Sequence, residues 1–586
     1  MTTPLALRLS ALGLLLAIVL VGAGLAQTKP QSSGTDYQQG LAAMQQGDLP
    51  AARVAFDRAV QSSPSNADAQ NMLGQVLLQQ GDVDGAVDHL RALVRLRPSL
   101  AIAHAYLAQA LQTKGELDGA ISEFRRAVQL APKQPEAHRS LARALSLQQK
   151  IDDAITEMRE AIRLSTPSAE LQDELGVLQA QQSKLTDAET AFRHALKLSP
   201  KYEPAYLHLG ATLYKENNFD GAKTVLAQAV QLDPHDATAW YTQGITLESM
   251  GERQAALDSL TRAAELQPNS PTLQTRLGLL AQRLGDMDRA GAAFSKVVQQ
   301  APADPEAHNN LALALLQRGD GEAAIKEFQE ALKLRPDDAE FRQNLGTAYL
   351  QKTDFDAAVS EFRGALKLTP DSASLHYDLA LALKLKDDLP AAMAEWKEAI
   401  RLDPKLADAH YSLGITLWQT GDFPGAAEQL RAAIQIQPDY AEAYYTLGTV
   451  LKQMGKYPEA ADALRQAIKL QPDFAGAHTT LAGVLRQLGD SAGAAAEAKA
   501  GTEISSEKNS LQAATFATNS GRRLLSTGDV DGAISQFRAA TAAAPTYAQA
   551  HYQLGIALAQ KGQKQEADQE FHRASELDPH LTPPVR

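Results

Sequence analysis

The chain has 586 residues, a formal net charge of -13 at pH 7, 5% aromatic residues and no cysteine. The acidic balance argues against a nucleic-acid-binding protein, which needs a basic surface. The absence of cysteine excludes disulfides, thiolate metal sites and a cysteine nucleophile.

The N-terminus has the pattern of a secretory signal at residues 1–26. Arg8 precedes an uncharged apolar run from Ala11 to Ala26, which ends in small residues before Gln27. This order of charge, apolar stretch and small residues is typical of a cleaved signal. The run is shorter than the roughly 20 residues of a spanning helix, so we expect cleavage, with an uncleaved inner-membrane anchor as the alternative. In both cases the protein is expected to be exported, either periplasmic or secreted, and only this segment would contact a membrane.

From Ser33 to Leu581 the sequence repeats. Alanines recur every 34 residues, and after one slip of five residues the series resumes at Ala533 and Ala567; the first series consists of Ala52, Ala86, Ala120, Ala154, Ala188, Ala222, Ala256, Ala290, Ala324, Ala358, Ala392, Ala426, Ala460 and Ala494. A fixed period near this length marks a stack of identical supersecondary units.

The turn residues divide each repeat into two helices. We number the positions of a repeat from 1 to 34, starting at Ser33. Most repeats have proline at position 32, such as Pro98, which is expected to close the second helix. Glycine at position 15, such as Gly81, is expected to end the first helix with a positive φ. An aspartate usually follows, as in Asp82 and Asp320, where it can cap the second helix.

The small and large residues predict how the two helices pack. Positions 8, 20 and 27 hold glycine or alanine in nearly every repeat, for example Gly210, Ala222 and Ala229, whereas position 24 holds a large apolar residue such as Phe192. Small residues let two helices approach closely, and the large residue fills the space beside them.

This pattern resembles the tetratricopeptide repeat, most clearly in residues 407–440 and 441–474, over some sixteen repeats. The resemblance implies an all-α fold, a right-handed α-solenoid superhelix of helix–turn–helix units. It also implies that the first helices line a concave groove, in which positions 2, 5, 9, 12 and 13 contact a peptide or protein partner. The asparagine ladder and the carboxylate clamp of specialised members are not reproduced, so their partners are not expected here.

One region departs from the pattern. In the fourteenth repeat Ala498 replaces the large residue, Gly501 stands at position 27 and Ser506 replaces the proline. A weak contact between neighbours makes a soft point in a one-dimensional stack. We therefore predict a main array at 33–508, a linker or hinge at 509–513, a terminal pair of repeats at 514–581 and a tail at 582–586.

No compact catalytic motif is present, so no catalytic residue, cofactor or metal is predicted and an enzyme is not expected. Two Asp-Val-Asp-Gly stretches, at 82–85 and 529–532, resemble the start of a calcium loop. Leu93 and Ala540 stand where such a loop requires glutamate, and both stretches coincide with the turn between helices.

Seven histidines recur at position 4, on a different first helix each time, with no second ligand near them in the sequence. A packing role is expected, and a metal site or a pH sensor are the alternatives; the residues are His104, His138, His308, His376, His410, His478 and His551.

Aromatic and cationic residues gather at the expected groove positions of four consecutive repeats. Position 5 holds Tyr377, Tyr411 and Tyr445, and position 12 holds Lys384, Trp418, Lys452 and Arg486. Tyrosine and tryptophan contribute strongly to binding at interfaces, and interleaved cations favour an acidic partner. Packing between neighbouring helices is an equal alternative for the tyrosines. Trp240 and Trp396 stand at core positions and are expected to be structural.

The predicted function is a non-catalytic scaffold that is exported and binds a protein or peptide partner in its groove. The alternative is an accessory subunit for polysaccharide export or modification, which binds a glycan or its synthase.

Overall fold

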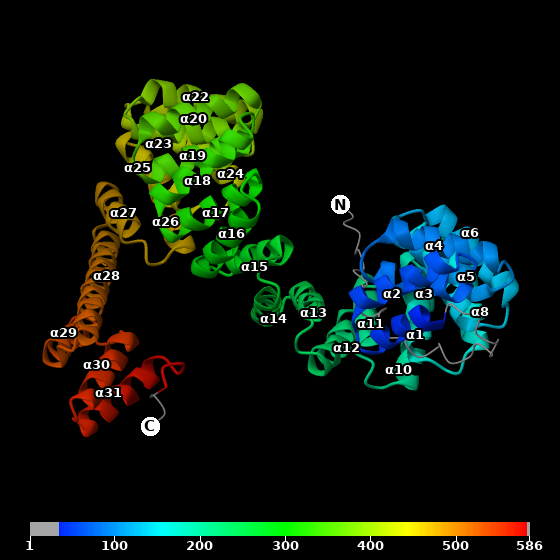
Figure 1. Cartoon of the computed structure of the whole chain (residues 1–586). Helices are drawn as coiled ribbons and strands as arrows, with labels where there is room; N and C mark the ends of the chain where they lie inside the picture. The colour runs from blue at the N-terminus through cyan, green and yellow to red at the C-terminus, as the bar shows by residue number, and fades with distance from the viewer. Residues whose placement is uncertain (1–33, 583–586) are drawn as a thin grey trace. The chain divides into compact units, whose positions relative to one another are not determined.

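The computed structural model describes residues 34–582, so the predicted signal at 1–26 and the last four residues of the predicted tail lie outside the described part. Every regular element in this part of the chain is an α-helix. Contacts divide the chain into two compact units, Met1–Asp286 and Met287–Arg586. Within each unit, consecutive helices pack on one another in chain order (Figure 1).

The described part of the first unit contains fifteen helices: α1 (Gly34–Gln45), α2 (Leu49–Ser62), α3 (Ala67–Gln79), α4 (Val83–Leu96), α5 (Ala101–Lys114), α6 (Leu117–Leu130), α7 (Pro135–Leu147), α8 (Ile151–Leu164), α9 (Ala169–Gln181), α10 (Leu185–Leu198), α11 (Glu203–Lys215), α12 (Phe219–Leu232), α13 (Ala237–Ser249), α14 (Arg253–Leu266) and α15 (Pro271–Arg283).

The second unit contains the remaining described helices: α16 (Met287–Gln300), α17 (Pro305–Arg318), α18 (Gly321–Leu334), α19 (Ala339–Gln351), α20 (Phe355–Leu368), α21 (Ala373–Leu385), α22 (Leu389–Leu402), α23 (Ala407–Gln419), α24 (Phe423–Ile436), α25 (Ala441–Gln453), α26 (Tyr457–Leu470), α27 (Ala475–Gln487), α28 (Ser491–Ser526), α29 (Val530–Ala543), α30 (Ala548–Gln560) and α31 (Lys564–Leu577). None of the described helices is both long and apolar enough to cross a membrane.

The turn between the two helices of a repeat has the predicted backbone. Position 15 has a positive φ in every repeat, with glycine in eleven of them, such as Gly81 at 83°. Only glycine adopts this region without steric cost. The other five repeats place Gln149, Ser183, Asn217, Thr353 and Asp387 in the same conformation.

The predicted cap at Asp82 and the predicted helix end before Pro98 are confirmed, whereas the predicted cap at Asp320 is not. The Asp82 carboxylate accepts a hydrogen bond from the Gly85 amide at 3.1 Å and so caps α4, and α4 ends at Leu96, two residues before Pro98. Asp320 makes no such bond. Its carboxylate instead accepts a hydrogen bond from Arg318 Nε at 2.5 Å. The arginine side chain, two residues earlier, takes the place of the backbone amide as the donor.

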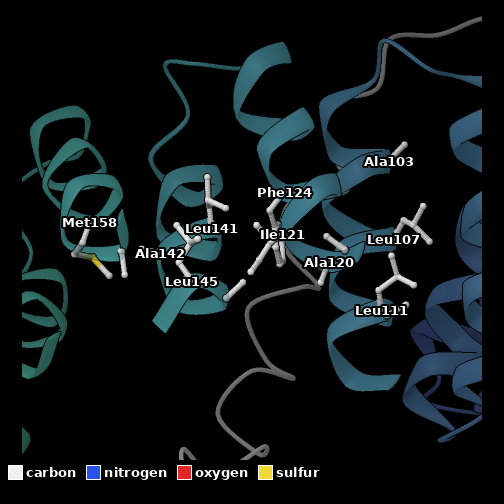
Figure 2. Close-up of a cluster of buried hydrophobic side chains, with 14 of the residues drawn as sticks. Ala103, Leu107, Leu111, Ala120, Ile121, Phe124, Leu141, Ala142, Leu145 and Met158 are labelled. Atoms are coloured by element: carbon white, nitrogen blue, oxygen red, sulfur yellow. The ribbon is translucent and has the colours of Figure 1, made fainter. Parts of the chain in front are cut away.

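Small residues at positions 8 and 20 hold the paired helices close together. The recurrent alanines at position 20 are fully buried in nearly every repeat, Ala120 and Ala222 among them. At position 8, a Cβ placed on Gly176 would lie 2.5 Å from the ring of Phe192. Figure 2 shows the resulting core, in which Ile121 and Phe124 of α6 lie between α5 and the Leu141 and Leu145 side chains of α7.

The structure corrects the linker predicted at 509–513, because these residues lie inside α28, a single helix of 36 residues (Figure 1). Ser506 stands where other repeats have proline, and neither proline nor glycine occurs from Thr502 to Ser520. Nothing therefore stops the second helix of the fourteenth repeat. It continues into the first helix of the fifteenth, so Ala514, the predicted start of the terminal pair, is also mid-helix. Hinge motion at this place stays a prediction.

Candidate partner-binding face

The first helices of successive repeats are joined by a ladder of side-chain hydrogen bonds. One line of bonds connects position 5 of a repeat to position 6 of the next, and a second connects position 12 to position 13. The pairs include Arg139–Glu174, Asp173–His208, Gln343–Asp378 and Asn309–Asn344 on the first line and Trp418–Gln453 and Glu248–Arg283 on the second. The same face therefore presents positions 5, 6, 12 and 13 of each repeat, where the predicted site residues stand.

The predicted tyrosines lie on this face, on α21, α23 and α25. All three are partly buried. The hydroxyl of Tyr377 lies near Ser412 of the next repeat, and that of Tyr411 lies near Thr446. Burial raises the pKa of both hydroxyls above the ordinary tyrosine value. These tyrosines therefore contribute to packing while part of each side chain remains accessible.

Two of the tyrosines also contact aromatic residues at the end of their repeats. The ring centroid of Tyr411 lies 4.8 Å from that of Tyr440, and that of Tyr445 lies 4.7 Å from that of Phe474. Tyr440 in turn donates a hydrogen bond to Asp408 at 3.0 Å. Tilted pairs at this separation stabilise a fold beyond their buried area. The contacts orient both rings before any partner is present.

Trp418 is also partly buried, on α23. Its Nε1 donates to Gln453 Oε1 at 2.7 Å, and its ring packs at the edge of the cluster around Leu447 and Leu451. The indole is thus held in a defined orientation with an accessible part. Trp396, by contrast, is fully buried as expected, and Trp240 donates from Nε1 to the Pro234 carbonyl at 3.0 Å.

The cationic side chains of this face differ in their contacts within the protein. Lys384 is partly buried, and its Nζ lies 5.9 Å from the centre of the Trp396 ring, a cation–π distance. Lys452 and Arg486 are exposed, and neither has an ion-pair partner among residues 34–582. The positive charge at the α25–α27 end of the face is therefore available to a partner.

The two arginines of α7 on the same face are already paired with glutamates of the next repeat. Arg139 and Arg143 each donate from Nε to Glu174 at 3.1 Å, and Arg139 also reaches Glu170. Burial by itself would raise the pKa of Glu174, but the bonds from the two arginines outweigh it and hold the pKa below its ordinary value. Internal pairing leaves this part of the face without free positive charge.

The seven histidines at position 4 each connect three segments. Nδ1 lies 2.6 Å from a glutamate at position 23 in six of them and 2.8 Å from Gln429 in His410. Nε2 donates to the carbonyl of the preceding repeat's proline at 3.0–3.3 Å. No second ligand is near these histidines in the sequence, because position 23 is 19 residues away, but it faces position 4 across the helix pair.

The proline carbonyl accepts a side-chain hydrogen bond in repeats without histidine as well. Gln70, Tyr206, Gln274 and Arg342 at position 4 donate to it, as Trp240 does. Sequence reasoning missed this role, although the signal was present: position 4 holds a side chain with an N–H or O–H donor in every described repeat except those with Asp36 and Ala517, whereas the size of that side chain varies. Both ring nitrogens of the histidines are engaged, and residues 34–582 contain no group of three metal-ligating side chains.

Family models identify the repeats. The model described as "Tetratricopeptide repeat" matches residues 37–101, 86–135, 106–169, 445–507 and 518–580, and the one described as "TPR repeat" matches 383–421 and 417–455. The model "Cilia and flagella-associated protein 70 C-terminal domain" matches residues 165–380. No curated protein matches the sequence.

Solved structures are similar to parts or most of the chain. YrrB, a "TPR protein with an unusual peptide-binding site", is 26% identical over 32% of this chain and 97% of its own, with a TM-score of 0.29. MamA is 27% identical over 28% and 96%, with a TM-score of 0.27. Yeast Tom70 is 17% identical over 72% and 96%, with a TM-score of 0.35. From the matched repeats and the all-helical architecture, the chain is an α-solenoid of the tetratricopeptide repeat family, a fold that suggests a scaffold for protein–protein interactions.

Proposed function

We propose that the chain is an exported, non-catalytic scaffold that binds an acidic protein or peptide on the face formed by α21, α23, α25 and α27. The observation that carries this proposal is the pairing of oriented aromatics with free cations. Tyr411, Trp418 and Tyr445 are held by contacts within the protein, while Lys452 and Arg486 are exposed and unpaired among the described residues.

The energetics favour this face over other parts of the ladder. Aromatic side chains that are already ordered lose little conformational entropy on binding. A carboxylate would gain charge-assisted hydrogen bonds from Lys452 or Arg486 without first breaking an internal ion pair. At α7 the partner would have to displace Glu174 from two arginines, which costs the bonds already formed.

Two double variants test the binding site by crosslinked pull-down from the native envelope fraction with mass spectrometry. Tyr411→Ala with Trp418→Ala removes the aromatic part, and Lys452→Glu with Arg486→Glu reverses the exposed charge. The matched control is Tyr241→Ala, at the same repeat position on α13. We expect both double variants to lose the same protein and the control to retain it, with capture by the wild type weakening as salt rises.

Equal capture by all variants would remove this face from the binding site. Loss of a polysaccharide, rather than a protein, from the aromatic variant alone would favour the accessory subunit of a glycan pathway. Export is tested separately by N-terminal sequencing of the native protein. A chain that begins at Gln27 supports it, whereas an intact Met1 in the cytoplasmic fraction contradicts it.

A further inference from the structure

Neighbouring repeats normally bury a fixed set of positions against each other. Positions 21, 24 and 28 of a second helix pack on positions 3, 7 and 10 of the next first helix. Between α4 and α5, Val87 and Leu90 pack with Ala103, Leu107 and Ala110 in one cluster, and all five are at most 3% exposed. This contact is the interface that joins one repeat to the next.

On α28 most of the same positions are not covered by any other helix of residues 34–582. At the end that belongs to the fourteenth repeat, Ala495 and Thr502 are exposed at positions 21 and 28. At the end that belongs to the fifteenth, Phe516 and Arg523 are exposed at positions 3 and 10. Phe516 is the extreme case: its side chain is 76% exposed, where the corresponding Ala103 is fully buried.

The continuous helix prevents these two surfaces from meeting within one chain. In a regular repeat the chain turns between the second helix and the next first helix, which allows them to pack antiparallel. Here they are the two halves of one helix of 36 residues, about 54 Å long. Each half therefore exposes the surface that the other half would have covered.

Together these surfaces form one stripe, centred on Asn509, that is exposed except at the partly buried Ala498, Ser505 and Ser520. Its members lie 4, 7, 11 and 14 residues before and after Asn509 and are Ala495, Ala498, Thr502, Ser505, Ala513, Phe516, Ser520 and Arg523. This spacing places them on one face of a helix. Two copies of the stripe in antiparallel orientation pair Thr502 with Phe516, Ala498 with Ser520 and Ala495 with Arg523. In repeat numbering these pairs are 28 with 3, 24 with 7 and 21 with 10, the positions that face each other between regular repeats.

A shallow groove overlaps the middle of this stripe and extends toward α29; it is lined by Thr502, Ser505, Ser506, Asn509, Ser510 and Ala513 of α28 and by Ala543 of α29. Small and hydroxyl side chains of this kind let two helices approach closely. The stripe contains no acidic residue and one basic residue, Arg523, at its end, so two copies meet without like charges near the centre.

We infer that α28 pairs antiparallel with α28 of a second copy of this chain. In this dimer the last two repeats of each chain complete the stack that the partner's fourteenth repeat leaves open. A two-fold interface requires one surface that is complementary to itself, and antiparallel pairing meets this condition because it places positions 28, 24 and 21 of each copy against positions 3, 7 and 10 of the other. This exchange of the last two repeats between the chains restores the contact between repeats that the continuous α28 prevents within one chain.

The absence of cysteine from the sequence makes crosslinking a direct test. Asn509→Cys places a thiol at the symmetry centre, so mild oxidation of the full chain should give a disulfide-linked dimer. The matched control is Leu511→Cys, two residues along α28 on the other side of the helix and 47% exposed. A mixture of Thr502→Cys and Phe516→Cys chains should form the mixed dimer, as antiparallel pairing requires, in preference to either homodimer.

Phe516→Asp tests the energetics by analytical ultracentrifugation. Because Phe516 is exposed in the single chain, we expect the variant to fold and its dimer dissociation constant to rise by at least about tenfold. A wild-type chain that stays monomeric at every accessible concentration would overturn the inference. So would a Leu511→Cys chain that crosslinks as fast as Asn509→Cys, or a dimer that Phe516→Asp leaves unchanged.

Discussion

His104 allows the contribution of the position-4 histidines to be measured against a natural alternative. Its Nδ1 lies 2.6 Å from Glu123 Oε2, and its Nε2 donates to the Pro98 carbonyl at 3.0 Å. In the preceding repeat Gln70 donates to the Pro64 carbonyl at the same distance. We predict that His104→Leu destabilises this part of the array and that His104→Gln largely preserves it.

The magnitude follows from the groups that lose their partners. The His104 side chain is 8% exposed and that of Glu123 is 27% exposed, so water replaces the lost contacts only in part. A buried group left without its partner costs about 1–3 kcal/mol. Loss of the bond to the carbonyl and of the bond to the carboxylate should together cost roughly 2–4 kcal/mol. Glutamine can donate to the Pro98 carbonyl, and water can reach the partly exposed Glu123, so we expect its cost to be about 1 kcal/mol.

Hydrogen exchange is the suitable assay, because a long array of repeats does not unfold in one two-state transition. The free energy of local opening should fall in α5 and α6. A loss of roughly 2–4 kcal/mol accelerates exchange there by about 30- to 1,000-fold. Amides of α30 serve as the internal control, since a stack of repeats transmits the effect only to neighbours.

Equal protection in the leucine variant and the wild type would show that the histidine contributes packing volume alone. Equal loss in the leucine and glutamine variants would refute the role of the proline carbonyl, since glutamine restores that bond and not the ring.

Three further predictions concern single positions. Thr353 is β-branched at a φ of 59°, so Thr353→Gly should raise the local stability of α19 and α20 by about 1 kcal/mol; slower exchange in these helices would confirm it. The buried Trp396 Nε1 has no hydrogen-bond partner within residues 34–582, so Trp396→Phe should change stability by less than about 1.5 kcal/mol, whereas Trp396→Ala should cost about 3–5 kcal/mol. A phenylalanine variant as unstable as the alanine variant in denaturation would contradict this. Burial, together with the negative charges of Asp236 and Asp233, raises the pKa of Glu203 to about 7 from its ordinary value of 4.5. The folded state then binds the proton more tightly than the unfolded state, so the wild type loses stability as pH rises between these values; Glu203→Gln should raise the melting temperature more at pH 8 than at pH 5, and an equal rise at both would refute the assignment.

The sequence alone determined the repeat and its local geometry, because the signals for both are short-range. Proline at position 32, glycine at position 15 and the small residues at positions 8 and 20 act within one turn or one helix pair. Their spacing therefore predicted the helix ends, the positive φ at Gly81 and the burial of Ala120, all of which the structure contains.

The tertiary structure decided which side chains meet across repeats. The bond from His104 to Glu123 joins residues 19 apart, and that from Trp418 to Gln453 joins residues 35 apart. These contacts form only when the helices are stacked, so the spacing in the sequence does not predict them. It also decided which charges of the expected site are paired, since the pairing of Arg139 with Glu174 and the lack of an ion-pair partner for Lys452 in the described part of the chain depend on neighbouring repeats. At α28 the missing proline was visible in the sequence, but only the stack shows that the extended helix leaves Phe516 uncovered. Local signals set where helices begin and end, and contacts between repeats set what each helix presents.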